Sequence, residues 1–74
     1  MNLGNELRKA REMAGLSQEK LAFEANVHRT YVSLLERGQK SPTVDVLFRI
    51  CKALNVKPSV LLARVERANK RSGV

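Results

Sequence analysis

Apolar residues recur every three or four positions over most of the chain, which is the spacing that places side chains on one face of a helix. Two segments, residues 3–14 and 44–54, carry this pattern most clearly, and Gly15 follows the first as a typical helix terminator. The pattern predicts an all-α protein. The positions on the predicted inner faces are Leu3, Leu7, Ala10 and Ala14 in the first segment and Val44, Leu47, Ile50, Cys51 and Leu54 in the second.

The stretch from Ser17 to Gly38 predicts two short helices joined by a tight corner. The Ser17 hydroxyl is suited to accept from the free backbone N–H groups of a first helical turn. Asn26 is suited to end this helix, because Asn tolerates the left-handed backbone conformation. The inner face of the first helix is expected at Leu21, Ala22 and Ala25, and that of the second at Val32 and Leu35. Two helices across so short a turn form the helix-turn-helix layout.

Two more helices are predicted beyond the loop at residues 39–42. Thr43 is suited to cap the helix of residues 44–54 and Asn55 to end it, while Pro58 favours the first turn of the last helix. The last helix is expected to present Leu61, Leu62 and Val65 on its apolar face. Val60 points elsewhere, either as part of a self-association surface or as an ordinary exposed residue. Residues 1–66 are expected to form one domain, and the basic tail 67–74 is expected to fray.

Composition and charge indicate a small aliphatic core and a polyanionic partner. Hydrophobic residues make up 43% of the 74-residue chain, and its aromatic residues are one Tyr and two Phe. Fourteen Lys and Arg against seven Asp and Glu give a net charge of +7, which suits nucleic acid or an anionic membrane. The basic residues are scattered over several predicted helices instead of lining one amphipathic face, which disfavours a membrane-surface peptide.

Residues that catalyse reactions or bind metals are sparse in this sequence. Cys51 and His28 are the single Cys and the single His, too few for a structural zinc site or an internal disulfide. Cys51 is expected to be a small core residue. No nucleophile stands beside a His and no acid is paired with a base, so we expect neither an enzyme nor a cofactor. With no apolar run of about 18–20 residues and no leader pattern, we expect a cytoplasmic protein.

Five short motifs give the chain a family resemblance. They are Gly15-Leu16-Ser17-Gln18-Glu19 with Leu21-Ala22, Arg29-Thr30-Tyr31-Val32-Ser33, Leu35-Glu36-Arg37-Gly38, Ser41-Pro42-Thr43 and Lys52-Ala53-Leu54-Asn55-Val56. Over roughly residues 3–63 the sequence resembles the lambdoid-repressor (Cro/C1-type, XRE) helix-turn-helix proteins, including small stand-alone regulators such as restriction-modification controller proteins. The resemblance implies a compact five-helix bundle of the lambda-repressor-like DNA-binding type.

In that family the third helix enters the major groove of DNA, which assigns base contacts to the matching residues here. The residues so assigned are Arg29, Thr30, Ser33 and Leu34. Arg29 suits guanine, because its planar fork can donate to both O6 and N7. Thr30 and Ser33 suit base edges or phosphates, and Leu34 suits a thymine methyl group.

The same resemblance places a second set of residues near the phosphate backbone. They are Gln18, His28, Tyr31, Arg37 and Lys40. Gln18 stands at a helix N-terminus, which is a ready anion site. Tyr31 either reaches a phosphate or packs at the helix edge, and Arg37 and Lys40 either steady the duplex or are solvated. His28 replaces the Ser or Thr that often caps this helix in the family, and a simple solvent-facing imidazole is the alternative to a phosphate contact.

The remaining matched pair, Arg11 and Glu36, bridges the first helix to the end of the third in the family, and we expect a structural ion pair here. Solvated, unpaired charges are the alternative.

The function that follows is a sequence-specific regulator of transcription, either a repressor or a controller protein. We expect it to bind double-stranded DNA, to be nucleoid-associated when bound, and to read a pseudo-palindromic operator as a homodimer. The expected dimer interface is formed by Val60, Leu61 and Val65. The alternative is the antitoxin half of a toxin–antitoxin pair, with a toxin as a further partner.

Overall fold

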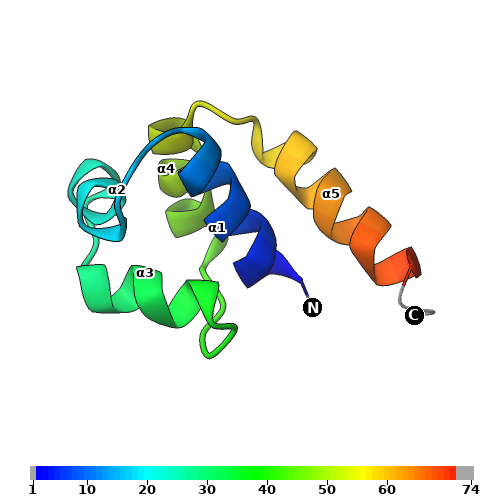
Figure 1. Cartoon of the computed structure of the whole chain (residues 1–74). Coiled ribbons are helices and arrows are strands. Elements are labelled where there is room, and N and C mark those ends of the chain that lie inside the picture. Colours follow the sequence, from blue (N-terminus) through cyan, green and yellow to red (C-terminus); the bar gives the residue numbers. More distant parts are fainter. Residues whose placement is uncertain (1, 72–74) are drawn as a thin grey trace.

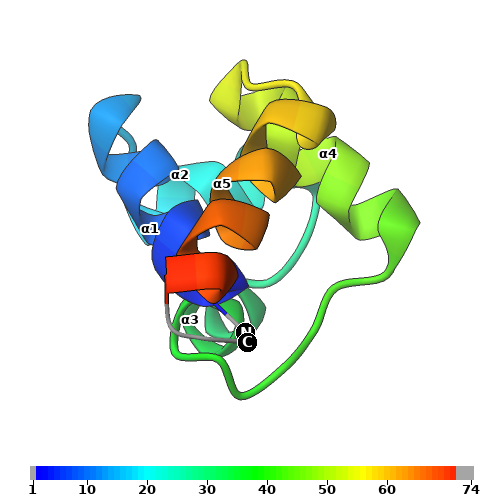
Figure 2. The same ribbon diagram turned by 90° about the vertical axis from the view of Figure 1, so that its right-hand side faces the viewer.

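The computed structural model describes residues 2–71, which contain five helices (Figure 1). They are α1 (Leu3–Met13), α2 (Gln18–Ala25), α3 (Arg29–Glu36), α4 (Val44–Leu54) and α5 (Pro58–Arg71). No strand occurs between residues 2 and 71, so the predicted all-α class and five-helix bundle are confirmed. α2 packs against α3 and α4, whereas α1 packs against α3 and α5. In Figures 1 and 2, α3 forms one edge of the bundle.

The starts of α2 and α4 are capped by the side chains that the sequence predicted. Ser17 Oγ accepts a hydrogen bond of 3.0 Å from the Lys20 backbone N–H. Thr43 Oγ1 accepts one of 3.2 Å from Val46 N–H. Each cap satisfies a first-turn donor that has no partner within its own helix. These two residues therefore determine where the second and fourth helices begin.

A residue in the left-handed backbone conformation follows each of the first four helices. Asn26 and Asn55 follow α2 and α4 with φ of 58° and 57°, as predicted. Gly15 and Gly38 take the same conformation, with φ of 73° and 75°, after α1 and α3. After α3, the N–H of Gln39 donates to Leu34 O at 2.9 Å, which closes the last turn. The corner between α2 and α3 is short because Asn26 reverses the chain at once.

The core is aliphatic, as the composition predicted, and every helix contributes to it. Leu21, Ala22 and Ala25 of α2 are all buried, so the predicted inner face of this helix is confirmed. Tyr31 packs at the margin of the core. The buried hydrophobic residues are Leu7, Ala10, Leu21, Ala22, Ala25, Val32, Leu35, Leu47, Ile50, Cys51, Leu54, Leu61 and Val65.

Three residues expected on inner faces are exposed. Ala14 lies beyond the last residue of α1, and Val44, 72% exposed, is the first residue of α4. Each stands at a helix end, where the apolar stripe runs past the neighbouring helices. Leu62 is 45% exposed, about 100° around the helix axis from buried Leu61, so the buried stripe of α5 is too narrow to include both residues.

The basic C-terminal segment also differs from expectation. α5 continues to Arg71, so residues 67–71 extend the last helix. The part of the prediction that falls on residues 72–74 lies outside the described residues. The domain boundary at residue 66 stays a prediction, and the helix itself passes this position without interruption.

Candidate nucleic-acid interface

The first half of α3 presents a row of polar side chains to solvent. Arg29 and Thr30 are exposed in its first turn, and Ser33 lies one turn later on the same face. Gln18, at the start of α2, joins them along one shallow hollow of about 240 Å³. The structure thus brings together three residues expected to contact bases and one expected to contact a phosphate. Leu34 is half-buried and lies outside this hollow.

The side chains of this hollow match the chemistry of base-pair edges. Arg29 carries five N–H donors in a planar fork, which fits the two major-groove acceptors of guanine. The hydroxyls of Thr30 and Ser33 donate or accept, so they suit both base edges and phosphate oxygens. None of the described residues that line the hollow is acidic, so the hollow carries no charge that repels a phosphate backbone.

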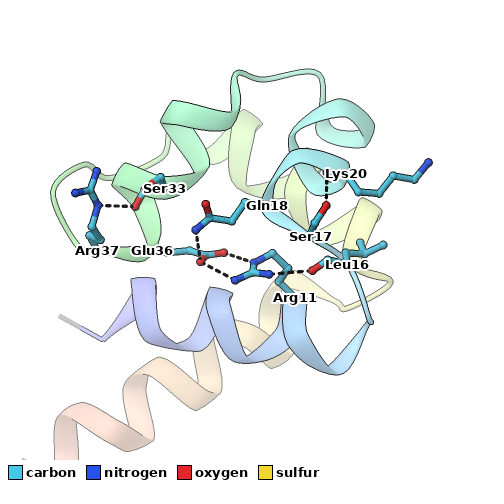
Figure 3. Close-up of polar contacts among 8 residues, drawn as sticks. All are labelled: Arg11, Leu16, Ser17, Gln18, Lys20, Ser33, Glu36 and Arg37. Atoms are coloured by element: carbon cyan, nitrogen blue, oxygen red, sulfur yellow. Dashed lines mark hydrogen bonds and ion pairs between the residues drawn. The ribbon is translucent and has the colours of Figure 1, made fainter.

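Behind this face, a buried ion pair joins α1 to the end of α3 (Figure 3). Arg11 Nε lies 2.6 Å from Glu36 Oε2, and Arg11 Nη2 donates to Glu36 Oε1 at 3.1 Å. The side chains are 13% and 3% exposed, respectively. The hydrogen bond with Glu36 raises the pKa of Arg11, so the guanidinium stays charged. The expected Arg11–Glu36 pair is thus present, in the bidentate form that fixes the angle between two helices.

Gln18 has a role that the sequence did not reveal. Its Nε2 donates to Glu36 Oε1 at 3.0 Å, and Arg11 Nη1 donates to the carbonyl of Leu16 at 2.9 Å. In Figure 3, Glu36 lies between Gln18 and Arg11, and the amide oxygen of Gln18 points away from Glu36. The network therefore connects α1, the turn before α2, α2 itself and α3. No local signal marks a contact between residues 18 and 36, so sequence reasoning assigned Gln18 a phosphate contact alone.

The other four residues expected near phosphates do not line the hollow. His28 and Lys40 are exposed, and Tyr31 is half-buried with its ring against the core, which agrees with the packing alternative. Arg37 is exposed and its Nε donates to the carbonyl of Ser33 at 3.4 Å, back along the helix. A phosphate contact by any of these four side chains stays a prediction.

His28 occupies the cap position of α3 without acting as a cap. Its backbone is extended (φ −79°, ψ 146°), as at Ser17 and Thr43, yet its side chain makes no cap hydrogen bond. We therefore expect His28→Ser to exceed His28→Ala in the free energy of unfolding by about 1 kcal/mol, because the hydroxyl accepts from a first-turn N–H. Urea denaturation of both variants measures the difference. Equal stability of the two would show that this position does not need a cap.

Two of the three residues expected at the dimer interface lie inside the monomer. Leu61 is fully buried and Val65 is 5% exposed, so both belong to the core of the monomer. They face inward because they lie four positions apart on the stripe by which α5 packs against α1 and α4. Val60, 41% exposed, remains available, and Phe48 of α4 is 56% exposed. The sequence did not single out Phe48.

No feature of a catalytic or metal site is found among the described residues. Cys51 is fully buried, and burial raises the pKa of its thiol, so the reactive thiolate is disfavoured. Within residues 2–71 no three His, Cys, Asp or Glu side chains gather where an ion would fit. None of the described helices has the length and apolar character needed to cross a membrane.

Comparison with known proteins places this geometry in a family. A family model described as helix-turn-helix matches residues 7–61. The control protein C.BamHI of Bacillus amyloliquefaciens is 47% identical over 60 residues, which cover 80% of this chain and 74% of that protein. An uncharacterised helix-turn-helix transcriptional regulator of Mycobacterium tuberculosis is 43% identical over 61 residues, which cover 82% of this chain and 44% of that longer protein.

Solved structures give the same result. The crystal structure of the restriction-modification controller protein C.AhdI from Aeromonas hydrophila matches with a TM-score of 0.79 and 38% identity, over 81% of this chain and 91% of that one. The resemblance inferred from the motifs is therefore confirmed. This chain belongs to the helix-turn-helix family of DNA-binding transcriptional regulators, and it is not an enzyme.

Proposed function

We propose that this protein regulates transcription by reading a pseudo-palindromic operator as a homodimer, with α3 of each copy in the major groove. The observation that carries the proposal is the hollow formed by Gln18, Arg29, Thr30 and Ser33. It combines a guanine-reading side chain with two hydroxyls on the edge of the bundle that α3 forms (Figure 1). The net charge of +7 adds a general attraction to DNA.

Two copies are proposed because one copy reads too little sequence. A single small module buries about 600–1,000 Å² of its surface on DNA and contacts a few base pairs. Two copies related by a two-fold axis double the readout and place their recognition helices about 34 Å apart, one turn of the duplex. The operator is then an inverted repeat whose half-site centres are about 10 base pairs apart.

The proposed dimer surface is the outer face of α4 with the start of α5. Val44 and Phe48 lie one turn apart on α4 and are 72% and 56% exposed. Phe48 also lines a surface hollow of about 560 Å³ that includes Val56 and Pro58, at the junction with α5. Val60 follows in the first turn of α5. A second copy of the chain would remove this apolar surface from water.

Replacing Phe48 by Lys is expected to weaken dimerisation at least about tenfold, because it removes an aromatic anchor and adds a charge to an apolar contact. Analytical ultracentrifugation over a concentration series measures the dimer dissociation constant. Phe23→Lys is the matched control, since Phe23 is 79% exposed on α2 and receives the same change. Unchanged dimerisation of Phe48→Lys, or equal weakening in both variants, would contradict this surface.

Selection of duplexes from a random DNA library tests the proposed function as a whole. The purified protein is expected to enrich an inverted repeat that contains a guanine in each half-site. Recovery of a single half-site without symmetry would contradict the dimer, and recovery of no common sequence would contradict specific recognition altogether.

A further inference from the structure

Gly4 brings the backbone of α1 unusually close to the last turn of α3. A Cβ atom added at Gly4 would lie 2.5 Å from the carbonyl oxygen of Leu35 and 2.6 Å from that of Glu36. Real Cβ atoms essentially never approach other heavy atoms within 3.0 Å. Both contacts are backbone atoms, so neither can rotate away as the end of a flexible side chain would. The N-terminal end of α1 lies beside α3 in Figures 1 and 2.

The same end of α3 is held by a second, polar contact. The Glu36 carboxylate binds Arg11 of α1 and Gln18 of α2. Gly4 and Arg11 are two turns apart on α1. The helix α1 therefore contacts the end of α3 twice, with Gly4 against its backbone and with Arg11 on the side chain of Glu36. The exposed Arg29 and Thr30 stand at the opposite end of α3. The eight residues of α3 form one continuous helix, so we expect a displacement of its last turn to move its first turn as well.

We propose that Gly4 is a positioning residue for DNA recognition. By allowing α1 to lie close to α3, it sets how far the first turn of α3 extends from the bundle. The proposal rests on the proposed function, in which α3 reads bases. Any side chain at position 4 forces the backbones of α1 and α3 apart by about 0.5 Å or more before the Cβ contact reaches 3.0 Å. Hydrogen bonds to base edges tolerate little displacement, because their donor–acceptor distances fall within about 2.7–3.2 Å. Long side chains that contact phosphates adapt to the same movement.

The test compares Gly4→Ala with the wild-type protein on two DNA probes, by fluorescence anisotropy at one salt concentration. One probe is the duplex recovered by selection from random DNA, and the other is a scrambled duplex of the same composition. Affinity for the selected duplex is expected to fall at least about tenfold, while affinity for the scrambled duplex stays within about twofold. The informative quantity is the ratio of the affinity for the selected duplex to the affinity for the scrambled duplex. A loss of fold alone would lower both affinities together and leave this ratio unchanged, so a change in the ratio reports a change in helix position.

Two control variants separate position from stability. Asn5→Ala adds no crowding, because Asn5 is exposed on α1, and it is expected to leave both affinities unchanged. Ile50→Val removes a methyl group from the core within α4, which lowers stability without adding an atom between α1 and α3, and it is expected to keep the ratio of the two affinities. All variants are first checked by circular dichroism. If Gly4→Ala is unfolded in buffer, every protein is measured again in trimethylamine N-oxide, which favours the folded state.

Three results would overturn the proposal. The first is an affinity ratio that is unchanged in Gly4→Ala, and the second is a ratio that falls equally in Ile50→Val. The third is a Gly4→Ala chain that stays unfolded in the osmolyte, because Gly4 would then be required by the whole fold. A wild-type protein that binds both duplexes equally would instead refute the proposed function on which the inference rests.

Discussion

Replacing Arg11 by Ala is expected to lower the free energy of unfolding by about 3–5 kcal/mol, which is typical when one partner of a buried ion pair is removed. The Glu36 side chain is 3% exposed and would keep only its bond from Gln18. A domain of this size is stable by roughly 4–11 kcal/mol in total, so the variant would be close to unfolding at room temperature. Urea denaturation followed by circular dichroism measures the loss.

Two further variants show whether that loss of stability comes from the unpaired Glu36 carboxylate. Arg8→Ala removes the same charge from an exposed position of α1 and is expected to change stability by less than about 0.5 kcal/mol. Arg11→Met combined with Glu36→Leu removes both charges and is expected to recover most of the stability, because no buried charge is then left without a partner. If Arg11→Ala were as stable as Arg8→Ala, the ion pair would not hold α3 in place.

Replacing Arg29 by Ala is expected to lower affinity for the selected duplex by about 1–3 kcal/mol and to relax the preference at one base pair of each half-site. The exposed side chain makes no contribution to the core, so stability should stay the same. Fluorescence anisotropy on duplexes with single base-pair changes measures both effects. Arg29 is thus predicted to affect which sequence is bound, and not only how strongly.

Lys40→Ala is the matched control for charge. Lys40 is exposed in the loop after α3, and its removal is expected to weaken binding to all sequences about equally. Equal losses on selected and scrambled DNA for Arg29→Ala would assign Arg29 to the phosphate backbone and contradict its role in base readout.

The sequence predicted the features of this fold that depend on local chemistry. Ser17 and Thr43 begin helices because a hydroxyl can reach a first-turn N–H, and this needs only the neighbouring residues. Asn26 and Asn55 end helices for an equally local reason, their tolerance of positive φ. The prediction of base contacts followed from the family motifs, and the structure places Arg29, Thr30 and Ser33 together.

Features that depend on how helices cross were beyond sequence reasoning. The bond from Gln18 to Glu36 and the closeness of Gly4 to α3 exist only after α1, α2 and α3 have packed. The burial of Leu61 and Val65, which were expected at a dimer interface, was missed for the same reason. An apolar stripe shows which residues share a face, but whether Leu61 meets the core or a partner depends on the neighbouring helices.

Binding to duplexes that lack one guanine N7 atom is the most direct measurement of whether α3 reads DNA from the major groove. Each guanine of the selected duplex is replaced in turn by 7-deazaguanine, which carries C–H in place of the N7 acceptor. Wild-type binding is predicted to weaken about tenfold at one guanine of each half-site, whereas Arg29→Ala should bind the modified and unmodified duplexes equally. Wild-type binding that is insensitive to every replacement, or an Arg29→Ala variant that loses as much as the wild-type protein, would contradict major-groove recognition through Arg29.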